Sequence, residues 1–352
     1  MEQYIGCDGH KQYSVFVGID ELGRESPAQR VKHERTEFSD FLRCLPPGSP
    51  IALETSGHWY WMVDAIEQAG HQPHLTHARK AKLLMGLVNK TDKLDARGLA
   101  TLLRNGTLPT VWIPPAPLRD QRELPRLRMT FVRMRTALKN RIHAALAKYG
   151  IAVSGVSDLF GKSGRQQLEQ RLSQLPPETQ RAVREELALL DPLQAQIDGL
   201  EGRIREVVQA TPMMQQLQSL PGVGPILAIV IALELGIIER FPNAEHFASY
   251  AGTVPRVQES GGHRRYGGAV RNDVNRYLKW AFIEAANCIV LNQAHWAERH
   301  IVQLYQRLQR RKGHAKAVVA VARHLAEATY WMLKTGAPYR EPTRTRRPAS
   351  QG

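Results

Sequence analysis

The first 105 residues alternate between short apolar runs of strand length and amphipathic segments with helical spacing. Apolar runs at 4–10 and 13–20 flank a short polar turn, which predicts a β-hairpin. Three more strands are expected near 28–34, 49–54 and 71–78, and helices near 36–45, 58–68 and 78–105. The last helix is interrupted near Asn89 and restarts after a predicted N-cap at Thr91. The predicted order of elements is therefore βββαβαβα.

Four acidic residues lie on these predicted elements. Asp8 lies on the first strand, Glu54 ends the fourth, and Asp92 and Asp95 lie on the last helix. Three meandering strands followed by alternating helices and strands is the order of a ribonuclease-H-like domain, which would use acids at these places. Residues three apart on a helix share a face, with Cβ atoms about 5–6 Å apart. We therefore expect the four carboxylates to converge.

Converging carboxylates indicate a metal site, because they repel one another unless cations lie between them. Hard oxygen ligands select Mg²⁺, with Mn²⁺ as the other candidate. Two such ions about 3.5–4 Å apart would hold the attacking and leaving oxygens of a phosphodiester. The alternative is that Asp92 and Asp95 form a solvated helix start, where acids interact favourably with the helix dipole. That alternative does not explain Asp8 and Glu54, which directly follow apolar runs.

The overall charge indicates the class of partner. Among 352 residues, 48 Lys and Arg against 33 Asp and Glu give a formal charge of +15, so a polyanion is expected. The 43% hydrophobic content is enough for a buried core. No apolar run approaches the roughly 20 residues that span a bilayer, so we expect no membrane contact and a cytoplasmic location. The cysteine spacing fits neither a disulfide framework nor a zinc cluster.

A long basic helix is predicted over 118–149. Its cations would follow the phosphates of a nucleic acid, while apolar residues at helical spacing pack on one side. The candidate phosphate contacts are Arg126, Arg128, Arg133, Arg135, Lys139 and Arg141, and the packing residues are Leu127, Phe131, Met134, Leu138 and Ile142. The alternative is an ordinary solvated helix face.

A second helix is predicted to begin at Asp191 as N-cap, with Pro192 in the first helical position. Apolar residues at alternating spacings of four and three then form a coiled-coil seam from Leu193 to Val207. Because the seam is only about two heptads long, packing against the basic helix and dimerisation are both open.

The stretch "SLPGVGPILA" resembles the hairpin of a helix-hairpin-helix motif. Gly222 and Gly224 would let the backbone approach a phosphate, and the second helix would present free amides to it. The alternative is an ordinary glycine turn between two helices.

A candidate nucleophile follows in the C-terminal third. Ser260 precedes two glycines and a basic run, which is a flexible and electropositive setting for a serine that attacks phosphorus. Arg256, Arg264 and Arg265 are its candidate phosphate contacts. The alternative is that Ser260 is a turn residue. Ser249, on a predicted amphipathic helix, is interpreted as structural.

The motifs "CDGHK", "ALETSG", "NKTDKLDARGLA", "LPGVGPILA" and "AGTVPRVQESGG" together resemble the DEDD-class transposases of the insertion-sequence family numbered one hundred and ten. The resemblance implies an N-terminal RuvC-like domain, a C-terminal transposase domain, and a metal tetrad of Asp8, Glu54, Asp92 and Asp95. It also implies that Ser260 attacks DNA to form a covalent phosphoserine intermediate. A noncoding bridge RNA that pairs with donor and target DNA is implied by the resemblance alone.

The resulting interpretation is a DNA recombinase of α/β plus all-α class. It has an RNase-H-like, mixed-sheet metal domain at 1–115, a basic helical and coiled-coil connector at 116–210, a mostly helical transposase domain at 211–337 and a disordered basic tail at 338–352. Strand exchange implies a homo-oligomer, a dimer assembling to a tetramer. Two alternatives stay open: a RuvC-like junction nuclease that uses metal-activated water, and a non-catalytic nucleic-acid-binding scaffold.

Overall fold

The computed structural model describes residues 3–86, 91–255, 257–266 and 274–341. The expected interruption near Asn89, the candidate Arg256 and residues 342–352 of the expected tail lie outside these ranges. The chain forms two compact units, Met1–Pro117 and Leu118–Gly352. The finer division into three segments and a tail stays a prediction.

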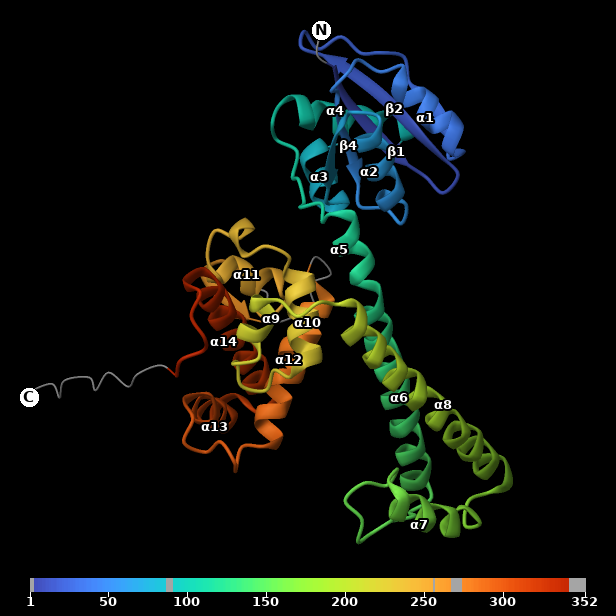
Figure 1. Ribbon diagram of the computed structural model, residues 1–352, viewed down its shortest axis with the longest axis vertical. Helices are drawn as coiled ribbons and strands as arrows, with labels where there is room; N and C mark the ends of the chain where they lie inside the picture. Colours follow the sequence, from blue (N-terminus) through green and yellow to red (C-terminus); the bar gives the residue numbers. More distant parts are fainter. Residues whose placement is uncertain (1–2, 87–90, 256, 267–273, 342–352) are drawn as a thin grey trace, which may run out of the picture. The chain divides into compact units, whose positions relative to one another are not determined.

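The first unit is a mixed five-stranded sheet with helices (Figure 1, blue to teal). The strand order is β3-β2-β1-β4-β5, in which β1 pairs antiparallel with β2 and parallel with β4. Its elements are β1 (Gln3–Gly9), β2 (Tyr13–Asp20), β3 (Gln29–Lys32), α1 (Arg35–Arg43), β4 (Pro50–Glu54), α2 (Trp59–Gln68), β5 (Gln72–Thr76), α3 (Ala78–Met85) and α4 (Asp92–Arg104). The predicted hairpin and order of elements are confirmed, and the sheet is consistent with a RuvC-like domain.

Helices cover both faces of this sheet, because alternate residues of a strand point to opposite sides. Ile5 and Cys7 of β1 belong to a hydrophobic cluster with residues of α1 and α2. Ala52 of β4 clusters instead with residues of α3 and α4. By this alternation, Gly6 and Asp8 of β1 face α4.

Gly6 determines how closely α4 approaches the sheet. A Cβ atom at Gly6 would lie 1.8 Å from the carbonyl oxygen of Ala96 and 2.7 Å from the backbone nitrogen of Ala100, both on α4. Helix backbone cannot rotate away as a side-chain end can, so only glycine fits at this point of β1. The close contact holds the first turn of α4 beside the end of β1.

The second unit is helical apart from one β-hairpin in the described residues. Helix α5 (Ala116–Gln121) begins in the first unit and ends in the second. The other elements of the second unit are α6 (Glu123–Lys148), α7 (Lys162–Leu172), α8 (Pro177–Val207), α9 (Pro212–Leu217), α10 (Pro225–Leu235), η1 (Ile238–Arg240), α11 (Ala244–Tyr250), β6 (Val257–Ser260), β7 (His263–Tyr266), α12 (Arg276–Leu291), α13 (His300–Lys312) and α14 (His314–Thr335). Among the helices described, none combines the length and apolar character needed to cross a bilayer.

The predicted start of the second long helix at Asp191 is wrong. Helix α8 already begins at Pro177, and Pro192 lies inside it on an exposed face. A proline inside a helix removes one hydrogen bond, at a cost of about 3 kcal/mol. Val183, Leu190 and Ile197 are buried at intervals of seven residues on both sides of Pro192, so the apolar face continues through it.

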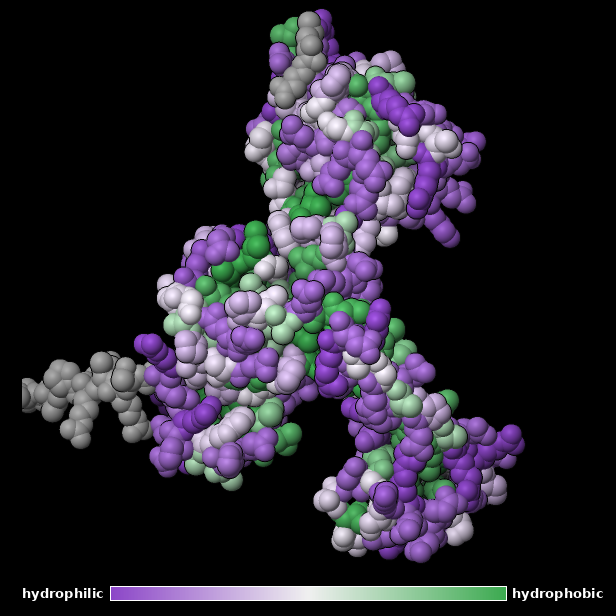
Figure 2. All heavy atoms as spheres, in the orientation of Figure 1, coloured by the Kyte–Doolittle hydropathy of each residue, from purple (hydrophilic) through white to green (hydrophobic). Residues whose placement is uncertain are grey.

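Helices α6 and α8 lie side by side (Figure 1, green and yellow-green). Hydrophilic side chains cover much of their visible surface in Figure 2, with hydrophobic residues between the helices. The predicted seam packs within the chain, because Ile197 and Ile204 are buried. The predicted packing stripe on α6 is partly wrong: Leu127 and Met134 are 41% and 52% exposed.

Polar pairs cross-link α6 to α8 at heptad-like intervals. The pairs are Arg128 with Glu201, Arg135 with Gln194, and Arg141 with Glu186. As the α6 residue number rises, the α8 number falls, so the two helices are antiparallel. These arginines therefore occupy the flanking positions of an antiparallel coiled coil, where charged side chains set the pairing of helices.

Candidate functional site

The first candidate site lies where β1 and β4 end beside α4. The parallel register pairs Cys7 with Leu53, so Asp8 and Glu54 are the next residues on neighbouring strands. By the alternation of side chains both face α4. Helix α4 begins at Asp92, directly after its predicted N-cap, Thr91. The Thr91 hydroxyl accepts a hydrogen bond from the Leu94 amide at 3.3 Å.

A histidine lies between two of the acids. His10 Nε2 is 3.2 Å from Asp8 Oδ2 and 3.1 Å from Asp92 Oδ2. The Tyr13 hydroxyl donates a hydrogen bond to the same Asp92 oxygen at 3.0 Å. The His10 amide donates to the Tyr13 carbonyl at 2.8 Å across the β1–β2 turn, which holds the imidazole at the site.

The site favours an added positive charge. Burial raises the pKa of the Asp8 carboxyl, nearby His10 lowers it in part, and the charges of Asp95 and Asp92 raise it again. Asp95 is itself 8% exposed. The Asp92 side chain is 42% exposed and that of Asp8 13%. Negative charges held this close together are stabilised by a cation.

The donor set suits a divalent metal ion. Among the described residues, the ligand atoms of Asp8, His10 and Asp92 lie within 4.8 Å of one another. The buried His10 Nε2 forms no hydrogen bond to a described atom, despite its two close carboxylates. The structure thus brings Asp8 and Asp92 of the predicted tetrad together with an unpredicted histidine. Glu54 and Asp95 lie on the same side of the sheet but outside this three-residue group.

The second candidate site is the β6–β7 hairpin of the second unit. Ser260 is the last residue of β6 and pairs with His263 across a two-residue turn. Gly261 and Gly262 have φ angles of +57° and +78°, so both require the left-handed backbone that glycine adopts without strain. Ser260 therefore ends a strand, whereas the sequence predicted a flexible glycine loop. Arg264 and Arg265 lie on the facing strand β7.

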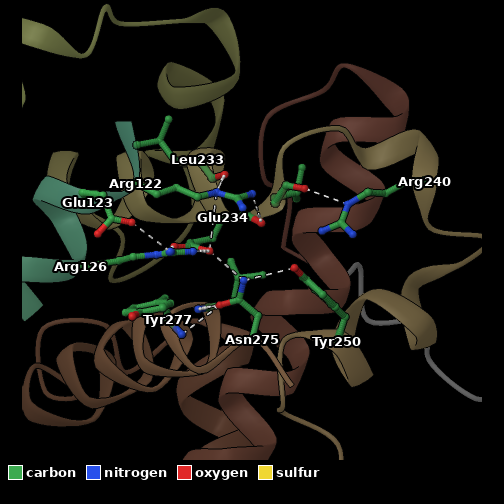
Figure 3. Close-up of polar contacts among 11 residues, drawn as sticks. Arg122, Glu123, Arg126, Leu233, Glu234, Arg240, Tyr250, Asn275 and Tyr277 are labelled. Atoms are coloured by element: carbon green, nitrogen blue, oxygen red, sulfur yellow. Dashed lines mark hydrogen bonds and ion pairs between the residues drawn. The ribbon is translucent and has the colours of Figure 1, made fainter. Parts of the chain in front are cut away.

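The segment that carries this hairpin is closed at its base. The amide of Asn275, the N-cap of α12, donates to the carbonyl of Tyr250, the last residue of α11, at 2.8 Å. Asn275 Nδ2 donates to Glu234 Oε2 at 2.9 Å (Figure 3). Tyr250 and Asn275, which flank residues 251–274 in the sequence, thus lie next to each other.

Glu234 is the centre of the network in Figure 3. Its side chain is 3% exposed and accepts two hydrogen bonds from Arg126, at 2.7 and 3.1 Å. Arg122 donates to the carbonyls of Leu233 and Glu234 at the end of α10. The network joins α6, α10 and α12, so the side chain of Arg126, a predicted phosphate contact, is 20% exposed and paired with a buried carboxylate.

The other predicted cations differ in their surroundings. Arg128, Arg135 and Arg141 are bound to α8, and Lys139 lies 4.7 Å from the Phe160 ring centre. Arg133 is exposed and has no ion pair or hydrogen bond within the described chain. Their role in phosphate binding stays a prediction, and Arg133 has the side chain most available for it.

The predicted glycine hairpin lies between α9 and α10. Gly222 has φ +76°, and a Cβ atom there would lie 2.3 Å from the Ala285 carbonyl of α12. Packing alone therefore requires this glycine. Gly224, the N-cap of α10, is exposed and has open space around it. Phosphate binding by the hairpin stays a prediction.

Sequence reasoning missed three residues that shape these sites: Gly6, His10 and Glu234. A glycine inside the apolar run "YIGCDG" does indicate a close backbone approach. His10 follows Asp8 by two residues, which is the spacing of one strand face. Glu234 interrupts the apolar run "ILAIVIALEL", where a buried acid needs a partner.

Comparison with known proteins finds transposase families that match an N-terminal and a C-terminal part of the chain. A transposase family model for the DEDD transposases of IS110 matches residues 5–151, and a model described as "Transposase IS116/IS110/IS902 family" matches residues 214–301. A probable family 20 transposase of Pseudomonas aeruginosa is 28% identical over 96% of this chain and 98% of its own length. The transposase for insertion sequence element IS1111A of Coxiella burnetii is 25% identical over 96% of this chain and 91% of its own. With both models matched in order and relatives aligned over nearly the whole chain, the protein belongs to the IS110 family of transposases.

Proposed function

We propose that this transposase moves an insertion sequence by a serine-dependent, metal-assisted reaction on DNA that a noncoding RNA guides. The observation that carries the metal part is the convergence of Asp8, Asp92 and His10 beside α4. The resemblance of the hairpin motif to the family supports the serine part. Guidance by RNA rests on the family resemblance and is compatible with the charge of +15.

In this proposal Asp8, Glu54, Asp92 and Asp95 hold Mg²⁺ or Mn²⁺. The bound cation supplies positive charge that stabilises phosphoryl oxygens as they gain negative charge. Tyr13 orients Asp92 through its hydrogen bond, and Gly6 keeps α4 close enough for Asp92 to face Asp8. These residues set the position of the carboxylates before any DNA binds.

Ser260 is the proposed nucleophile. Its Oγ forms a bond to a DNA phosphorus atom while the bond from that phosphorus to one strand end breaks. The serine proton is lost and the departing strand end leaves as a hydroxyl, so the protein holds the other end as a phosphoserine ester. Arg264 and Arg265 on β7 are proposed to offset charge on the phosphate. Exchange of several strands requires more than one such chain.

A covalent adduct tests this proposal. Wild type, Ser260→Ala and Ser249→Ala are incubated with guide RNA, labelled DNA and Mg²⁺, then denatured and examined for protein-linked label. We expect the adduct in wild type and Ser249→Ala and its loss in Ser260→Ala. Cleavage by wild type without any adduct would instead favour a nuclease that uses metal-activated water. Absence of both reactions, with binding retained, would favour a scaffold.

A further inference from the structure

We propose that His10 is a direct ligand of the divalent cation through Nε2, and that this nitrogen gives the site a preference for Mn²⁺ over Mg²⁺. The inference rests on the proposed function, because it concerns the same carboxylate site. It adds to the four acids a residue that belongs to a different ligand class.

The positions of the three donor atoms fit one ion. In an octahedral site with bonds of about 2.0–2.1 Å, neighbouring ligand atoms are about 3 Å apart. His10 Nε2 lies 3.2 Å from Asp8 Oδ2 and 3.1 Å from Asp92 Oδ2. His10 Nε2 thus has the separation of an adjacent ligand from each of the two carboxylate oxygens, and all three ligand atoms lie within 4.8 Å of one another.

The surroundings of His10 hold its ring in this position. The ring centre is 4.7 Å from that of Tyr13, and the Tyr13 hydroxyl holds Asp92 on the other side. The buried Nε2 has no hydrogen bond to a described atom. Nε2 is nevertheless 3.2 Å from Asp8 Oδ2 and 3.1 Å from Asp92 Oδ2, so a metal ion bound here would meet the nitrogen and both carboxylates together.

The chemistry of nitrogen sets the expected selectivity. Mg²⁺ strongly favours oxygen ligands and keeps several waters, whereas imidazole suits transition metals. Mn²⁺ accepts carboxylates and gains more than Mg²⁺ from a nitrogen ligand. A site of carboxylates plus one imidazole should therefore bind Mn²⁺ more tightly than a site of carboxylates alone.

The competing explanation is that His10 serves as a cation in place of the metal and moves away when a metal binds. Electron spin echo measurements on Mn²⁺ bound to the full-length protein separate the two, because a directly bonded imidazole gives a ¹⁴N modulation. The variants are His10→Gln, His10→Asn and Asp8→Asn. His74→Gln, which removes a half-buried histidine on β5 of the same sheet, is the matched control.

We expect ¹⁴N modulation in wild type and His74→Gln, and its loss in both His10 variants, which should keep wild-type circular dichroism. Titration should show Mn²⁺ affinity falling roughly tenfold or more in His10→Asn, with Mg²⁺ affinity changed by less than about threefold. Mn²⁺ binding that Asp8→Asn abolishes, but that shows no ¹⁴N modulation in wild type, overturns the role of His10 and leaves the metal site intact. Mn²⁺ binding unchanged in Asp8→Asn rejects the carboxylate site itself, and the inference with it.

Discussion

Replacement of Glu234 by alanine should destabilise the second unit strongly. The carboxylate is 3% exposed, accepts two hydrogen bonds from Arg126 and one from Asn275, and lies 3.8 Å from Arg122. Removing it leaves buried guanidinium groups without their counter-charge. Breaking a buried pair from one side costs about 3–5 kcal/mol, and we expect Glu234→Ala to fall in that range.

The assay is denaturant unfolding of the full chain, from which the free energy of unfolding of the second unit is measured for each variant. Glu327→Ala is the matched control, because Glu327 pairs with Arg323 on the same helix at 31% and 41% side-chain exposure. That exposed pair should be worth about 0.5 kcal/mol or less. A double-mutant cycle with Arg126→Ala should return a favourable coupling energy. A cost below about 1 kcal/mol for Glu234→Ala would refute the reasoning.

Four other predictions concern the first unit and the coiled coil. Gly6→Ala should abolish Mn²⁺ binding, measured by titration, because its Cβ cannot coexist with the α4 backbone. Arg133→Ala should lower the slope of nucleic-acid affinity against salt by about one unit without lowering stability, whereas Arg135→Ala should lower the melting temperature because it loses Gln194. Asp8→Asn should raise the melting temperature of the metal-free protein at neutral pH. Burial raises the pKa of Asp8 in the folded state. The folded protein therefore loses stability as the pH rises from the pKa of Asp8 in the unfolded chain to its higher pKa in the folded state, and asparagine avoids this loss.

Elements of the first unit were predictable because each residue pattern is local. The alternation in "YIGCDG" and "PIALE" specifies both the strands and their two faces. The Thr91 N-cap needs only the residues that follow it. The position of His10 beside Asp92 is different, because it depends on a packing distance between β1 and α4, which are separated by some 80 residues and brought together by Gly6.

The long helices show why the charge pattern of the sequence allows two interpretations. Arginines at 128 and 135, one heptad apart, fit a phosphate-binding face and a coiled-coil flank equally well until the partner helix is known. The structure supplies Glu201 and Gln194 on α8 as their partners. Likewise, proline is common at the first helical position, so Pro192 suggested a helix start. In the structure, α8 continues through Pro192, because Leu190 and Ile197 are buried on either side of it.

Both candidate sites depend on buried residues that touch neither metal nor DNA in the proposal. Gly6 sets the distance from β1 to α4, and Glu234 fixes the base of the segment that bears Ser260. Loss of transposition in a variant of either residue therefore cannot identify a catalytic group. Metal affinity distinguishes Asp8 from Glu234, because only substitution of Asp8 should change the affinity for the metal ion. Adduct formation combined with stability distinguishes Ser260 from Glu234. A Ser260 variant should lose the adduct at normal stability, because loss of the nucleophile should leave the fold unchanged, whereas a Glu234 variant should be destabilised.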